Sequence, residues 1–125
     1  MNILLVEDEP ALRTGTEQFL RQRGFTVVTA VSGEEALEKF TEADVIILDI
    51  MLPGMSGIEV LHQIRQTSDM PVLMLTALHD EPTQVASFDE LADDYMSKPF
   101  SLVILEKRIR ALPSKIGRAS CRERV

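Results

Sequence analysis

The residues best suited to chemistry are consecutive acids near the start of the chain. Glu7, Asp8 and Glu9 directly follow an apolar run at residues 3–6. Two carboxylates about 5 Å apart repel each other by roughly 3 kcal/mol at an effective dielectric constant of ~20. A hard divalent cation relieves this repulsion, because Mg²⁺ prefers oxygen ligands and usually binds one or two carboxylates together with a phosphate. The stretch is therefore a candidate metal site.

The elements that must position these acids are predicted by apolar runs that alternate with helical patterns from residue 2 to residue 112. This alternation is typical of parallel βαβ units. We expect five strands, near Asn2–Val6, Thr26–Ala30, Val45–Asp49, Val72–Leu75 and Tyr95–Ser97. Right-handed crossovers would make them an open, doubly wound α/β sheet, in which ligands bind beyond the carboxyl ends of the strands.

Helices are expected in the gaps between the strands. Pro10 suits a first helical turn, and Gly24 suits the end of that helix. The patterns Ser32-x-x-Glu35 and Ser56-x-x-Glu59 predict capping boxes for the second and third helices, and Pro82 is a possible start of the fourth. The fifth helix carries a core-facing stripe at helical spacing, formed by Leu102, Leu105, Ile109 and Leu112.

Polar residues stand at the carboxyl ends of several predicted strands. Besides the first acids, Asp49 ends the third strand, Thr76 follows the fourth and Lys98 follows the fifth. The parallel topology would bring three acids, a hydroxyl and an ammonium to one edge of the sheet. That set of groups could bind a divalent cation and a phosphoryl group.

Composition limits the class of protein. A chain of 125 residues with 26% charged and 45% hydrophobic residues is typical of one soluble globular domain. Aliphatic stretches such as "VIIL" are too short to span a membrane, and the N-terminus does not resemble a signal peptide. Since the single cysteine, Cys121, allows no internal disulfide, we expect a cytoplasmic protein.

The charge is unevenly distributed. Residues 114–125 carry four basic residues and one acid, so the net charge of −7 leaves −10 for the residues before them. A body this acidic disfavours direct contact with nucleic acid. Residues 113–125 also lack apolar periodicity, and we interpret them as a vector-derived tail or a truncated linker after a domain at 1–112. The alternative is a native basic tail that binds an acidic partner.

Four motifs together resemble the receiver domain of two-component response regulators. They are "LLVEDEP", "DVIILDIMLPGMSGIEVL", "PVLMLTA" and "ADDYMSKPF", in the order and spacing of that family over residues 1–112. The resemblance implies a flavodoxin-like sheet with strand order 2-1-3-4-5. It also implies that Asp49 accepts a phosphoryl group, and that Mg²⁺ or Mn²⁺ is bound by Glu7, Asp8, Asp49 and the backbone carbonyl of Met51. Thr76 and Lys98 match the residues that hold the phosphoryl oxygens, Tyr95 matches the aromatic switch, and the Lys98–Pro99 bond is expected to be cis.

The resemblance also implies partners. A sensor histidine kinase would supply the phosphoryl group, and the protein would catalyse only its own phosphorylation and dephosphorylation. "DDY" and "KPF" resemble the branch that carries a winged-helix domain, so DNA would be bound only through a C-terminal domain that this chain lacks. In that branch a dimer forms across the fourth helix, fifth strand and fifth helix, where Asp94, Ile104 and Arg108 would lie.

Other functions on similar folds match the residues less well. A flavodoxin-type FMN carrier needs a phosphate loop rich in Ser, Thr and Gly after the first strand, where this chain has "EDEP". A haloacid dehalogenase-type phosphatase needs a second Asp two residues after the nucleophile, where this chain has Met51. An interaction module that works without phosphorylation remains an alternative.

Overall fold

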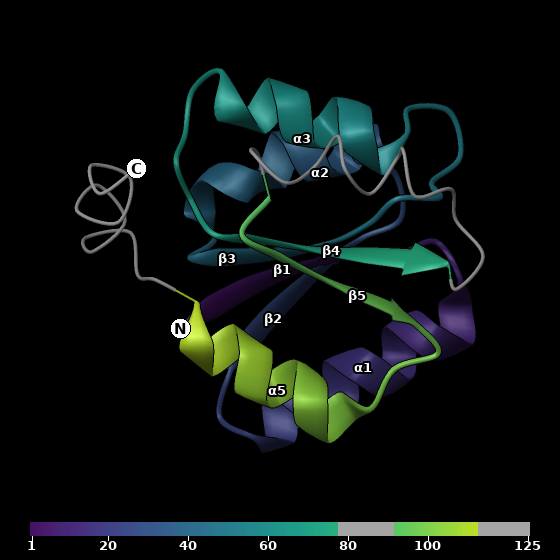
Figure 1. The fold of residues 1–125 in the computed structure, drawn as a ribbon, viewed down its shortest axis with the longest axis vertical. Helices are drawn as coiled ribbons and strands as arrows, with labels where there is room; N and C mark the ends of the chain where they lie inside the picture. The colour runs from purple at the N-terminus through teal and green to yellow at the C-terminus, as the bar shows by residue number, and fades with distance from the viewer. Residues whose placement is uncertain (78–91, 113–125) are drawn as a thin grey trace.

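The computed structural model describes residues 1–77 and 92–112 and contains one sheet of five parallel strands. Their order is β2-β1-β3-β4-β5, which confirms the predicted topology (Figure 1). The strands are β1 (Asn2–Val6), β2 (Thr26–Ala30), β3 (Val45–Asp49), β4 (Val72–Ala77) and β5 (Asp94–Lys98). The first three have the predicted bounds, whereas β4 is two residues longer and β5 one residue longer at each end. Asp94 pairs with Leu73, and Thr76 and Ala77 pair with Ser97 and Lys98.

Helices cover both faces of this sheet (Figure 1). On one face lie α2 (Gly33–Lys39), its short 3₁₀ continuation η1 (Phe40–Glu42) and α3 (Gly57–Arg65). On the other face lie α1 (Pro10–Gln22) and α5 (Leu102–Ala111). The helix predicted to begin at Pro82 and the tail at 113–125 fall outside the described residues. Among the helices that are described, none is long and apolar enough to cross a membrane.

Local signals in the sequence account for the helix ends. The Ser32 hydroxyl accepts a hydrogen bond from the Glu35 N–H (3.2 Å), and Ser56 caps α3 in the same way. The Glu35 carboxylate accepts from the N–H of Val31 (2.9 Å) and not from that of the cap residue, so this part of the predicted capping box is displaced by one residue. Gly24 follows α1 with a φ of +96°, a left-handed conformation that glycine adopts without steric cost.

Alternate residues of the strands fill two hydrophobic cores. Leu4, Ile46 and Met74 belong to the core under α2 and α3, and their neighbours along the strands belong to the core under α1 and α5. The predicted stripe of α5 is confirmed. Leu105 and Ile109 are fully buried, and Leu102 and Leu112 pack at the edge of the core under α1 and α5.

The strand β2 forms one edge of the sheet, and basic side chains from two helices bind its backbone. Arg21 of α1 donates a hydrogen bond to the Val27 carbonyl (2.6 Å), and Lys39 of α2 donates one to the Thr29 carbonyl (3.0 Å). Each of these side chains also forms an ion pair with the glutamate four residues earlier in its helix, Arg21 at 3.0 Å and Lys39 at 2.6 Å. Two carbonyls of this edge strand are therefore occupied, from opposite faces of the sheet.

Candidate functional site

Three charged residues end three of the parallel strands, β1, β3 and β5, on the same face of the sheet. They are Glu7 after β1, Asp49 at the end of β3 and Lys98 at the end of β5. In each strand the residue two positions earlier packs in the core under α1 and α5. Since side chains alternate between the two faces of a strand, these rows bring the three charged groups together beyond that core.

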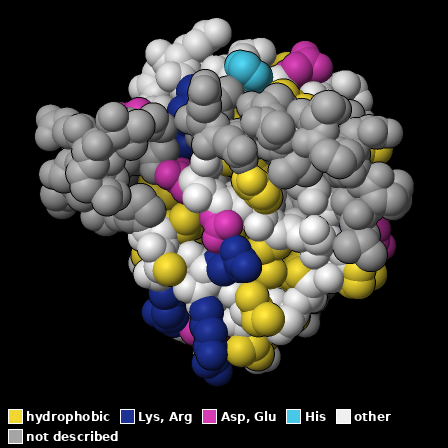
Figure 2. Space-filling model, in the orientation of Figure 1, with side chains coloured by type: hydrophobic (Ala, Val, Ile, Leu, Met, Phe, Trp, Pro, Cys, Tyr) yellow, Lys and Arg dark blue, Asp and Glu magenta, His cyan; other side chains and the backbone are white. Residues whose placement is uncertain are grey.

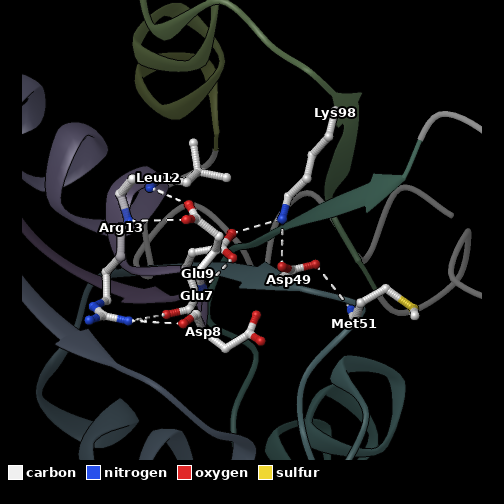
Figure 3. A network of polar contacts seen from close by, with 9 residues as sticks. Glu7, Asp8, Glu9, Leu12, Arg13, Asp49, Met51 and Lys98 are labelled. Atoms are coloured by element: carbon white, nitrogen blue, oxygen red, sulfur yellow. Dashed lines mark hydrogen bonds and ion pairs between the residues drawn. The ribbon is translucent and has the colours of Figure 1, made fainter.

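The Lys98 ammonium joins the two buried acids (Figure 3). Its Nζ lies 2.6 Å from Asp49 Oδ2 and 2.9 Å from Glu7 Oε1. Glu7 and Asp49 are only 1% and 2% exposed, so their charges have little access to water. Burial alone would lower the pKa of Lys98, but the hydrogen bonds to Asp49 and Glu7 outweigh it and raise that pKa. Lys98 therefore stays charged and partly neutralises the pair.

One ammonium does not neutralise the whole cluster. Burial raises the pKa of the Glu7 carboxyl, and the Asp49 charge adds to that rise, against the opposing effect of Lys98. The Asp8 side chain is exposed, and one carboxylate oxygen each of Glu7, Asp8 and Asp49 lie within 4.8 Å of one another. Three oxygen ligands at this spacing, with charge left to balance, fit a hard divalent cation.

The carboxylate of Asp49 is held from two directions. Its Oδ2 meets Lys98, and its Oδ1 accepts a hydrogen bond from the N–H of Met51 (3.0 Å). Met51 lies in the loop after β3 and is 64% exposed. The structure therefore brings Met51 beside Asp49 through its backbone, while the predicted role of its carbonyl as a metal ligand stays a prediction.

The third of the opening acids has a structural role. The Glu9 carboxylate caps α1 by accepting hydrogen bonds from the N–H groups of Leu12 (2.6 Å) and Ala11 (3.3 Å). Its own N–H donates to Glu7 Oε2 (3.1 Å). Glu7 thus accepts from both Lys98 and the backbone, whereas Asp8 is the exposed acid of the cluster.

Two further residues of the site were not identified from the sequence. Arg13 of α1 donates from one guanidinium nitrogen to the carbonyls of Glu7 (3.1 Å) and Asp8 (3.3 Å) (Figure 3). Gly57, the first residue of α3, packs so closely on β3 that a Cβ there would lie 2.2 Å from the Asp49 carbonyl oxygen. The available signals were a basic residue in the first helix after an acidic loop, and a glycine directly after the Ser56 cap.

Thr76 and Tyr95 lie on the face of the sheet opposite to that of Asp49, near the end of the strand that carries it. Asp49 pairs with Leu75, so the buried Thr76 is the next residue along β4. Tyr95 pairs with Met74, which puts Tyr95 and Thr76 on the same face of the sheet. Tyr95 is half-buried at the edge of the core under α2 and α3. The Lys98–Pro99 peptide bond that follows β5 is cis, which confirms the expectation of a cis bond at this position.

The residues predicted for an interface lie on β5 and α5. Arg108 pairs with Asp94 of the same chain, at 2.9 and 3.0 Å from its two carboxylate oxygens. Val103 and Ile104 are 51% and 49% exposed on α5. Figure 2 shows hydrophobic side chains beside charged ones on this side of the molecule. A role for these residues between subunits stays a prediction.

Known proteins resemble this chain in sequence and fold. A family model described as the response regulator receiver domain matches residues 3–110. Response regulator RR06 of Streptococcus pneumoniae serotype 2 is 50% identical over 114 residues, which cover 90% of this chain and 52% of that protein. The uncharacterized transcriptional regulatory protein YclJ of Bacillus subtilis is 46% identical over 114 residues, which cover 90% of this chain and 50% of that protein. The chain therefore spans about half the length of these relatives.

Solved structures show the same architecture. The response regulator TrrA of Thermotoga maritima, solved in complex with Mg²⁺ and BeF, has a TM-score of 0.79 and 37% sequence identity to this chain. The match covers 88% of this chain and 96% of that chain. This similarity agrees with the strand order and the helix layers described above.

Proposed function

The chain belongs to the response regulator receiver domain family, and from this premise we propose that it is a switch phosphorylated on Asp49. A sensor histidine kinase would supply the phosphoryl group from a phosphohistidine. The observation that carries the proposal is the buried Asp49 carboxylate, which is bound by Lys98 and lies beside Glu7 and Asp8. A carboxylate held only for stability would not need two further acids at its side.

The described contacts suit phosphoryl transfer. An Asp49 carboxylate oxygen would bond to the phosphorus as the phosphorus–nitrogen bond to the histidine breaks, and a proton already on the second ring nitrogen of the phosphohistidine lets a neutral imidazole leave. Lys98 would neutralise the phosphoryl oxygens, and the Met51 N–H would keep the carboxylate oriented.

A divalent cation completes this site in the proposal. Glu7, Asp8, Asp49 and the Met51 carbonyl would hold Mg²⁺ or Mn²⁺, which supplies positive charge to the phosphoryl oxygens when bound. Since both Glu7 oxygens already accept hydrogen bonds, Glu7 would act through a bound water. The Mg²⁺ in the related TrrA structure supports this choice of cation.

The phosphoryl group would be read by Thr76 and Tyr95. The Thr76 hydroxyl would bond a phosphoryl oxygen and draw the end of β4 inward, and Tyr95, on the same face as Thr76, would turn into the vacated space. Such a chain acts as a cytoplasmic switch and not as an enzyme on other substrates. In a protein of the length of its relatives, a C-terminal domain would bind DNA.

Beryllofluoride, a phosphoryl mimic, distinguishes this switch from a module that works without phosphorylation. We expect Mg²⁺ and beryllofluoride together to raise the melting temperature, because they bind the folded site and not the dispersed acids of the unfolded chain. Amide resonances of Thr76 and Tyr95 are expected to shift in the same titration. Asp8→Asn is expected to abolish most of both responses, and Glu38→Asn, at an exposed position on α2, is the control. A wild-type protein that ignores both ligands at millimolar concentration contradicts the proposed function.

Phosphorylation would control a dimer across β5 and α5. Ile104 is half exposed, so covering it would contribute about 1 kcal/mol for each subunit. The Asp94–Arg108 pair already exists within one chain, and an exposed ion pair contributes about 0–1 kcal/mol. We therefore place Ile104 at the centre of the interface and the ion pair at its rim.

Sedimentation of the protein activated with beryllofluoride tests this interface. Ile104→Glu is expected to dissociate the dimer more than Arg108→Ala does, because it puts a charge at the apolar centre. Wild-type association is expected to survive added salt, which screens ion pairs but not apolar contacts. If the Ile104→Glu variant still forms the dimer, the proposed interface is wrong and the dimer forms through another surface.

A further inference from the structure

Two acids of the cluster, Glu7 and Asp8, lie in a short loop in which few contacts fix their side chains. The loop consists of residues 7–9, between the end of β1 at Val6 and the start of α1 at Pro10. Glu7 is buried and bonded through its side chain, but the Asp8 side chain is exposed. Packing therefore does not set the direction of the Asp8 carboxylate, and the backbone of the loop must do so.

Arg13 binds this backbone. One of its guanidinium nitrogens donates to the Glu7 carbonyl (3.1 Å) and the Asp8 carbonyl (3.3 Å), and its own N–H donates to the carbonyl of the cap residue Glu9 (2.9 Å). Hydrogen bonds from a charged donor are stronger than those between neutral groups. Two successive carbonyls are thereby tied to a helix that packs on the sheet.

The direction of these bonds matters for the site. Figure 3 shows the Arg13 guanidinium on one side of the loop and the Asp8 carboxylate directed away from it. Arg13 therefore contacts carbonyl oxygens and leaves the Asp8 carboxylate oxygens available. A cation bound by Asp8 would not need to displace Arg13.

We propose that Arg13 is a positioning residue that holds the Glu7–Asp8 backbone so that the Asp8 carboxylate faces Asp49 and is ready to bind a divalent cation. This inference rests on the proposed function, because it takes Mg²⁺ as that cation. Residues behind the direct ligands of a metal fix ligand orientation, and their loss typically weakens metal affinity at least about tenfold.

A simple charge effect of Arg13 would have the opposite sign. A guanidinium near three carboxylates repels Mg²⁺, so removing its charge alone would strengthen Mg²⁺ binding. Removing a positioning residue weakens binding, because the carboxylates must then be ordered when the cation binds. The sign of the change in affinity therefore separates the two effects.

The test measures Mg²⁺ affinity by calorimetry, together with amide hydrogen exchange of the loop without metal. Arg13→Met is expected to weaken Mg²⁺ binding about tenfold and to speed exchange at Asp8 and Glu9. Arg13→Lys keeps the charge on a shorter side chain that cannot reach both carbonyls, and is also expected to bind more weakly. The matched control is Arg21→Met, because Arg21 lies in the same helix and also binds a backbone carbonyl, but far from the acids. It is expected to leave Mg²⁺ affinity unchanged.

The outcomes separate this inference from the proposed function. If Arg13→Met binds Mg²⁺ as tightly as the wild type or more tightly, the positioning role is overturned while the metal site stands. If Arg13→Met does not fold, wild-type affinity in Arg13→Lys overturns the positioning role in the same way. Equal weakening by Arg21→Met overturns it too, since the effect would then be a general loosening of α1. A wild-type protein without saturable Mg²⁺ binding overturns both proposals.

Discussion

A chain carrying Asp49→Ala is expected to gain no mass from acetyl phosphate and Mg²⁺, whereas the wild-type chain gains one phosphoryl group. Asp49 is the buried carboxylate in contact with Lys98 at the centre of the cluster, so its removal takes away the proposed nucleophile. The variant is expected to fold, because Lys98 still neutralises Glu7 and the repulsion between Glu7 and Asp49 is gone. Intact-mass spectrometry measures the difference directly.

The control for this experiment is an acid outside the cluster. Glu38→Ala removes an exposed carboxylate from α2, and it is expected to be labelled like the wild type. Equal labelling of Asp49→Ala and the wild type would contradict the assignment of the phosphoacceptor. Labelling of the wild type without any divalent cation would contradict the metal site.

Gly57→Ala is expected to lower the free energy of unfolding by about 3 kcal/mol or more and to slow phosphorylation. The new Cβ would lie 2.2 Å from the Asp49 carbonyl oxygen and 2.8 Å from the Ile50 Cα. These are backbone atoms, which cannot rotate away as the end of a side chain can. Either α3 moves away from β3, or the end of β3 moves with Asp49 on it.

Gly15→Ala is the matched control for that substitution. Gly15 lies in α1, and a Cβ there would meet no atom within 4 Å. Alanine is favoured over glycine within a helix by roughly 0.5–1 kcal/mol, so this variant is expected to be slightly more stable. Urea unfolding and the rate of labelling by acetyl phosphate are measured on both variants. A Gly57→Ala chain as stable and as active as the wild type would contradict the close contact.

The sequence was sufficient to predict the sheet where burial makes the pattern strong. Val45–Asp49 is aliphatic until its final acid, and the structure has the strand at those residues. The strand β5, with the sequence "DYMSK", lies at an edge and has a weaker pattern, so the sequence predicts it one residue too short at each end. Pairing with β4 sets those ends, and a single strand cannot show that pairing.

The predicted members of the site came together because they end parallel strands. Glu7, Asp49 and Lys98 could be expected at one edge from topology alone. Arg13 and Gly57 could not, because they act on backbone atoms of other segments. Arg13 reaches two carbonyls, and Gly57 makes room for one. Contacts of that kind leave only weak signals in the sequence, here a basic residue in the helix after the acidic loop and a glycine directly after the Ser56 cap.

The Arg21 and Lys39 side chains that bind the backbone of β2 affect whether other chains can add a strand to this edge of the sheet. An open sheet edge is a template on which strands of other molecules can add, and such growth leads to cross-β aggregates. Here an incoming strand would have to displace Arg21 from the Val27 carbonyl and Lys39 from the Thr29 carbonyl. Both are charge-assisted bonds, and each is braced by a glutamate in the same helix. Strand addition at this edge therefore has to break two charge-assisted hydrogen bonds, which opposes cross-β growth there.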